Sequence, residues 1–271
     1  MSVWNWLHIL AAYLIYVMVA ILTSILVRKT AGDLKDFSVR NSPRVLLMGG
    51  TANLIAMAAI LSLLVFWDHL PISGLGLSLS RRDVLAGAIG FGITFALAIL
   101  YLWILKRAKR IQSVEIVQPA ASSGQVINMT IGLIVLVTIV LQEEVLNRGY
   151  VAINTRSLGP WGVILTSTAI FVLIHFLSNR ANGYQLISWV VSGLILVTSY
   201  LLSGSLWVPV ILHYATDATN TLIFNITGQY SFFEASPPIT EVQRAAFRIV
   251  YGVVMTTVLF SIYDMQFKFF M

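Results

Sequence analysis

The amino-acid sequence predicts an all-α protein, a polytopic membrane helical bundle with about eight transmembrane helices. Composition is the first reason: 58% of the 271 residues are apolar and only 10% are charged, whereas a soluble domain carries about 25% charged residues. The second is the length of the apolar runs, each near the ~20 residues that cross a ~30 Å hydrocarbon core as a helix. Because backbone amides in lipid must be satisfied within each segment, helices are the economical structure for these runs.

Short polar stretches separate the apolar runs, and none looks long enough to divide the chain into two domains. The first run has no basic residue before it and is longer than the core of a signal peptide, so we expect it to remain as a helix. We therefore expect a single membrane domain over residues 1–271. The runs cover approximately residues 4–27, 45–67, 84–105, 126–146, 161–177, 186–202, 206–226 and 249–265.

Positive charge between the runs predicts the orientation. With the N-terminus outside, the cytoplasmic side holds 12 of the 17 Lys and Arg residues, as expected for cytoplasmic loops. We therefore expect a multi-pass protein of the cell membrane, in contact with the lipid bilayer. The basic residues form short clusters and no continuous stripe, so the pI of about 9.7 does not indicate a nucleic-acid partner.

Ionisable residues inside membrane helices are the candidates for function, because each costs ~2.5–3.5 kcal/mol at the bilayer centre unless it is compensated. With no cysteine in the chain, thiolate metal sites and a cysteine nucleophile are excluded. The acids and histidines well inside the runs are Glu143, Glu144, His175, His213 and Asp217.

The depth of these residues follows from the helical rise. A turn at residues 157–160 reverses the chain, and Glu143 and His175 each lie ~21–23 Å from it. The run that carries His213 and Asp217 starts from the same side, which places them ~12 Å and ~18 Å deep. We expect residues from three helices to converge in the middle layer of the membrane.

Helical spacing gives the two adjacent glutamates different neighbours. Glu144 and Arg148 are four residues apart with the acid first, the favourable order for an ion pair. Glu143 is turned by about 140° from Arg148 and has no basic partner on its own helix, so it is the candidate general base. A second stripe on one helix face consists of His213, Asp217 and Asn220.

Three ordered motifs carry a resemblance to a known family. Residues 143–150 read E-E-x-x-x-R-G-Y, residues 171–175 read F-x-x-x-H, and residues 213–217 read H-x-x-x-D. In this order they resemble the CPBP (CAAX protease and bacteriocin-processing, or Abi) family of intramembrane endopeptidases, which includes the type II CAAX prenyl proteases. We expect the catalytic core at about residues 126–226.

The resemblance implies an intramembrane endopeptidase of the glutamic type that hydrolyses a peptide bond of a membrane-anchored peptide or protein, either prenylated or of the leader type. Such hydrolysis requires a polar cavity that admits water. The roles carried over are water activation for Glu143 and His175, oxyanion stabilisation for His213 and Asp217, and support for Glu144, Arg148, Phe171 and Asn220.

One position departs from the family pattern. The family often has Asn where this chain has Asp217. An amide donates a hydrogen bond directly, whereas a carboxyl group does so only when it is protonated. Asp217 would therefore act in its protonated form or would instead orient His213, with Asn220 as the alternative donor.

Other mechanisms and functions remain open at this stage. The family is often labelled metalloprotease, and His175, His213 and Asp217 would be reasonable zinc ligands. The chain has no H-E-x-x-H motif, and a glutamate-activated water accounts for the same residues, so we expect no obligatory cofactor. The alternative functions are a noncatalytic membrane scaffold or immunity factor of the same fold and a small-solute transporter, although we find none of the inverted repeats typical of transporters.

Overall fold

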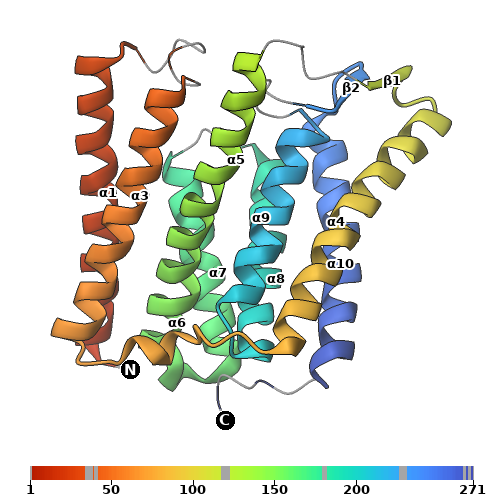
Figure 1. Ribbon diagram of the computed structural model, residues 1–271. Helices are drawn as coiled ribbons and strands as arrows, with labels where there is room; N and C mark the ends of the chain where they lie inside the picture. The colour runs from red at the N-terminus through yellow and green to blue at the C-terminus, as the bar shows by residue number, and fades with distance from the viewer. Residues whose placement is uncertain are drawn as a thin grey trace.

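The structure, a computed structural model, describes residues 2–33, 39, 42–116, 123–178, 182–225, 231–264, 267 and 270. Long helices run up and down between the two ends of a bundle (Figure 1). These helices are α1 (Val3–Thr30), α3 (Pro43–Ser62), α4 (Arg81–Arg107), α5 (Ser123–Glu144), α7 (Gly159–Ser178), α8 (Gly183–Ser203), α9 (Trp207–Leu222) and α10 (Glu241–Tyr263).

Short elements connect the long helices. A two-stranded antiparallel sheet pairs β1 (Ser113–Ile116) with β2 (Phe233–Ser236), at the upper end of the bundle in Figure 1. The helical turns are the π-helix η1 (Leu63–Trp67), the 3₁₀ helix η2 (Ile72–Leu75), the π-helix η3 (Val145–Tyr150), the short α6 (Val151–Thr155) and the 3₁₀ helix η4 (Arg156–Leu158).

The all-α membrane bundle is confirmed, but the count of eight spanning helices is not. Six helical stretches of the described residues are long and apolar enough to cross a membrane. One of them, residues 126–176, contains most of both α5 and α7. Helix α9 is not among the six, because it has only 16 residues and carries the polar stripe that begins at His213.

The last helix also begins earlier than the apolar pattern suggests. It starts at Glu241, where the side chain of Thr240 accepts a hydrogen bond from the Gln243 amide at 3.3 Å and caps the first turn. Arg244 and Arg248, which precede the last predicted apolar run, therefore lie on α10. A membrane span predicted from apolar residues alone ends at charged residues such as these, whereas the helix itself continues through them.

The chain reverses where the sequence indicated. It stays helical from α5 through η3 and α6 to Thr155, and Gly159 then turns it into α7 with a φ of 70°, which glycine adopts without steric cost. The wider turn of η3 follows Glu143 and Glu144 directly. Such π-helical turns within α-helices occur frequently at functional sites.

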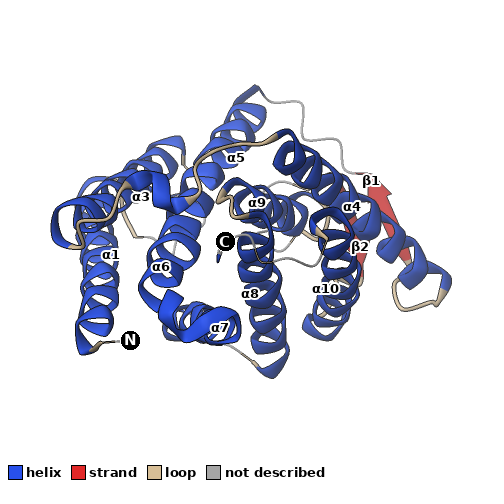
Figure 2. Ribbon diagram, turned by 90° about the horizontal axis from the view of Figure 1, so that it is seen from below, coloured by secondary structure: helices blue, strands red, loops and turns tan. Residues whose placement is uncertain are grey.

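Helices α8 and α9 occupy the middle of the bundle (Figure 2). Helix α8 packs against α7 and α10, and α9 packs against α4, α5 and α8. Helix α1 packs mainly on α3 and lies at one side of the bundle, with Leu10, Leu14 and Met18 exposed. This arrangement suits a bundle whose outer helices face lipid and whose inner helices carry polar side chains.

Helices α4 and α9 approach each other closely at a glycine. A Cβ atom at Gly90 would lie 2.2 Å from Leu212 Cδ2 and 3.1 Å from Met255 Cε. Leu212 directly precedes His213 on α9. The absence of a side chain at Gly90 therefore sets the distance of α4 from the helix that carries His213.

We expect Gly90→Leu to lower the stability of the bundle, because overpacking an interface costs typically ~1–3 kcal/mol. The matched control is Gly92→Leu, two residues along the same helix, where a Cβ would have no atom within 4 Å. Thermal unfolding in lipid nanodiscs measures both variants. An equally large loss of stability for Gly92→Leu would contradict the interpretation that overpacking between α4 and α9 destabilises Gly90→Leu.

Candidate active site

A polar cavity of about 220 Å³ lies between α5, α7, α8, α9 and α10. A water molecule takes up about 30 Å³ of the liquid, so the cavity is large enough for several. Helices α8 and α9 each line the cavity with one face, on which the residues follow the i, i+3, i+4 and i+7 spacing of a helix. These lining residues are Gln185, Ser188, Trp189 and Ser192 on α8, and His213, Thr216, Asp217 and Asn220 on α9.

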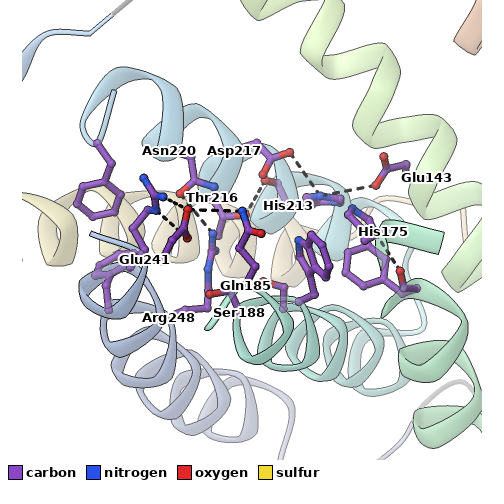
Figure 3. Close-up of a pocket in the computed structure, with 16 residues that line it drawn as sticks. Glu143, His175, Gln185, Ser188, His213, Thr216, Asp217, Asn220, Glu241 and Arg248 are labelled. Carbon is purple, nitrogen blue, oxygen red and sulfur yellow. Dashed lines mark hydrogen bonds and ion pairs between the residues drawn. The ribbon is translucent and has the colours of Figure 1, made fainter. Parts of the chain in front are cut away.

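The residues expected to carry the chemistry meet in this cavity. Glu143 at the end of α5, His175 on α7, and His213 and Asp217 on α9 all line it. His213 lies between the two acids, with its Nε2 at 3.9 Å from Glu143 Oε2 and 3.5 Å from Asp217 Oδ2 (Figure 3). Four side chains from three segments thus surround one polar space.

A buried carboxylate orients the His213 ring. Its Nδ1 is 2.7 Å from Glu144 Oε1, and a carboxylate only accepts hydrogen bonds, so Nδ1 is the donor. This bond leaves Nε2 directed towards Glu143 and Asp217. Glu144 therefore fixes which nitrogen of His213 faces the cavity.

Glu144 also forms the expected ion pair with Arg148. Arg148 Nη1 donates to Glu144 Oε1 at 3.1 Å, and both residues are fully buried. The guanidinium lies over the Phe171 ring at 4.5 Å from its centroid, within the range of a cation–π contact. One oxygen of Glu144 thus joins Arg148 to His213, a connection that helical spacing alone does not reveal.

The second histidine is held by its own helix. His175 Nδ1 donates to the Phe171 carbonyl oxygen at 2.9 Å, and because a carbonyl only accepts, Nε2 is the nitrogen that takes up a proton. The His175 ring packs between Phe171, with centroids 4.3 Å apart, and Trp189, with centroids 5.4 Å apart. Phe171 therefore contacts both His175 and Arg148.

Asn220 lies in the same cavity but at a different level. It follows His213 by seven residues, a rise of ~10.5 Å along α9. Its Oδ1 accepts a hydrogen bond from Arg248 Nη2 at 3.4 Å. The structure therefore places Asn220 with Arg248 and away from His213 and Glu143.

The zinc alternative does not fit this geometry. Among the described residues, no group of three or more His, Cys, Asp or Glu side chains is placed to hold a metal ion. In this geometry His175, His213 and Asp217 do not form a ligand set.

Comparison with known proteins agrees with the motifs. Residues 125–219 match the family model of the Rce1-like type II CAAX prenyl endopeptidases. Over this segment, the match supports the resemblance to the CAAX protease family that the three motifs indicate. The Rce1-like segment spans the helices from α5 to α9 and contains Glu143, His175, His213 and Asp217. No curated protein and no solved structure matches the chain significantly.

Several lining residues outside the three motifs were not anticipated. Gln185, Ser188 and Ser192 fall on one face of α8, and this polar periodicity in an otherwise apolar helix is the sequence signal that could have found them. Arg248 gave no such signal, because it stands at the edge of the last apolar run.

Helix α1 reaches the Rce1-like segment through one hydrogen bond. The Tyr13 hydroxyl donates to Asn147 Oδ1 at 2.5 Å, and Asn147 Nδ2 donates to the Glu143 carbonyl oxygen at 2.8 Å. Asn147 lies within η3. The backbone beside Glu143 is thus connected to the first helix of the chain.

We expect Glu144→Gln to lower the free energy of unfolding by on the order of 3 kcal/mol, because it leaves Arg148 as an unpaired buried charge. The matched variant Glu143→Gln makes the same substitution one residue earlier, where the side chain is 20% exposed, and should be close to neutral. Thermal unfolding in nanodiscs measures both.

The double variant Glu144→Gln/Arg148→Met should recover part of the lost stability, because it removes the charge that was left unpaired. Equal losses for Glu143→Gln and Glu144→Gln, or no recovery in the double variant, would contradict the proposed importance of the buried pair.

Proposed function

We propose that this protein is an intramembrane endopeptidase that cleaves a membrane-associated peptide substrate with a water activated by Glu143 and His175. The observation that carries the proposal is that Glu143, His175, His213 and Asp217 line one polar cavity. The Rce1-like match over residues 125–219 supports proteolysis at the level of the family.

The water is activated on the Glu143 side of the cavity. The Glu143 carboxylate takes a proton from the water, and the resulting hydroxide attacks the carbonyl carbon of the scissile bond. His175, with Nδ1 engaged by the Phe171 carbonyl, uses Nε2 to orient the water and assist the transfer. The proton then passes to the amine that leaves, so that hydrolysis consumes one water and regenerates the carboxylate.

His213 is placed to stabilise the oxyanion. With Nδ1 donating to Glu144, Nε2 donates as well when the ring is protonated. The carboxylates of Glu143, Glu144 and Asp217 act on the ring and compensate for its charge. A donor fixed before the reaction by a buried partner needs no reorganisation as charge develops.

We propose that the cavity opens at the cytoplasmic end of the bundle. The basic clusters Arg28–Lys29 and Lys106–Arg107 end α1 and α4 at the upper end in Figure 1, where α8 and α10 begin. Gln185 and Glu241, in the first turns of those two helices, line the cavity. We propose that the N-terminus lies outside and that a membrane-anchored peptide enters from the cytoplasmic end.

We expect Glu143→Ala to abolish cleavage, with a loss of ~10²–10⁴-fold or more from removal of the general base. The measurement compares new peptide termini in the membrane proteomes of cells that carry wild type or variant at matched expression. Glu115→Gln, an exposed acid in β1, is the control and should give the wild-type profile. Identical profiles for wild type and Glu143→Ala would instead favour a noncatalytic scaffold.

We expect Asp217→Asn to retain cleavage within about tenfold of wild type, because the amide keeps a hydrogen-bonding atom beside His213 Nε2. Asp217→Leu removes it and should cost ~10²-fold or more. Cleavage rates in reconstituted membranes measure both variants, with melting temperature as the control for folding. Equal rates for Asp217→Leu and wild type would show that Asp217 does not support His213.

A further inference from the structure

A second hollow of the surface runs as a groove between α1 and α3. Figures 1 and 2 show these two helices side by side at the edge of the bundle, and they pack against each other. The groove has a volume of about 530 Å³ and shares no lining residue with the candidate active site. The mechanism proposed above makes no use of it.

The walls of the groove are apolar along most of its length. Helix α1 contributes Val19, Leu22 and Leu26 from one face, and α3 contributes Leu47 and Ile55 among others. Apart from one arginine, the polar residues that line the groove are two threonines. Such walls suit a hydrocarbon chain and offer little to a polar ligand.

The length of the groove corresponds to one leaflet of a bilayer. Its lining residues on α3 extend from Arg44 to Ile55, eleven residues along the helix and therefore a rise of ~16.5 Å. Half of a ~30 Å hydrocarbon core is ~15 Å. The groove thus extends from the level of the lipid headgroups to about the middle of the membrane.

Two cations lie at the upper end of the groove in Figure 1, where α1 ends and α3 begins. Arg44 lines the groove, and Lys29 follows Leu26 by three residues, so it continues the same face of α1. Both side chains are exposed, and neither helix contains an acidic residue. Within the described parts of the chain, no carboxylate lies within 4.0 Å of either cation.

Unpaired cations are ordinary at a membrane surface, and these two become a candidate site only because an apolar groove lies directly below them. The combination is complementary to an amphiphile with an anionic head and a chain as long as one leaflet. The end with the cations is the one that the proposed orientation assigns to the cytoplasm, where anionic lipids give the membrane a negative surface potential.

We propose that the groove between α1 and α3 binds one acyl chain of an anionic phospholipid, whose phosphate is held by Lys29 and Arg44. The site lies outside the candidate active site and does not depend on the proposed proteolysis. Lysine and arginine both donate charge-assisted hydrogen bonds to phosphate oxygens.

The test counts the lipids that remain bound to purified full-length protein, by native mass spectrometry after release from detergent micelles. The probes are phosphatidylglycerol and phosphatidylcholine with identical acyl chains, offered at equal concentrations. Both contain a phosphate, but only phosphatidylglycerol carries a net negative charge. We expect wild type to retain phosphatidylglycerol about tenfold more than phosphatidylcholine, because each cation near the surface favours an anionic lipid.

Charge substitutions assign the preference to the two cations. Lys29→Gln/Arg44→Gln should retain the two lipids equally, and each single substitution should lose part of the preference. The matched control is Arg28→Gln, which removes a cation from the same end of α1. Arg28 lines a different groove, together with Tyr16 and Ile174, so this variant should keep the wild-type preference.

A substitution inside the groove tests the place of the acyl chain. Ala52 lines the groove, and Ala52→Phe should fill it and lower the retention of both lipids by about tenfold, because the chain loses its apolar contacts. Ala58→Phe is the matched control, at an exposed position of α3 that does not line the groove. It should leave the retention unchanged.

Thermal unfolding in detergent gives an independent measure. A lipid that binds the folded state raises the melting temperature, so phosphatidylglycerol should stabilise wild type and Arg28→Gln more than it stabilises Lys29→Gln/Arg44→Gln. An equal rise in all three proteins would contradict a site at Lys29 and Arg44.

Three results of the mass measurement would overturn the inference. They are equal retention of the two lipids by wild type, a preference that survives in folded Lys29→Gln/Arg44→Gln, and unchanged retention in Ala52→Phe. A dimer mass that Ala52→Phe abolishes would identify a second copy of the chain as the occupant. Displacement of the lipid by inorganic phosphate alone would indicate a free phosphate site. Because wild type alone decides the headgroup preference, the inference stays testable even if a variant fails to fold.

Discussion

The site depends on one carboxylate that lies entirely inside the bundle. Glu144 holds Arg148 and His213 through the same oxygen, and it is completely buried. In lipid such a charge is expensive unless it is compensated, and here a cation on its own helix supplies the compensation. Because His213 bonds to the same oxygen, the interaction that stabilises the charge pair also fixes the orientation of the His213 ring in the cavity.

The packing of the bundle keeps this network away from lipid. Helices α8 and α9 carry polar faces that could not be exposed to hydrocarbon, and they lie in the middle, packed against α4, α7 and α10. The more peripheral α1 is long, apolar and largely exposed. The central position of α9 also explains why its composition is less apolar than that of a membrane-spanning helix. A helix that is surrounded by protein need not be apolar on every face.

The sequence predicted the parts that depend on local spacing. The Glu144–Arg148 pair follows from i,i+4 geometry, and the common level of Glu143 and His175 follows from counting along two helices that share a turn. The bond from Glu144 to His213 could not be predicted, because it depends on how α9 is rotated against α5. The buried position of Arg248 was missed for a different reason: charged residues end an apolar run but do not end a helix.

The contact between Tyr13 and Asn147 connects the membrane environment of α1 to the candidate active site. Helix α1 exposes most of its surface, and the tilt of such a helix depends on hydrocarbon thickness as well as on its packing. Through Tyr13, Asn147 and the Glu143 carbonyl oxygen, a change of tilt reaches the backbone of the proposed general base. We therefore expect the rate of the proposed cleavage to depend on bilayer thickness, so that rates measured in short-chain and long-chain lipids differ. Tyr13→Phe should reduce that difference.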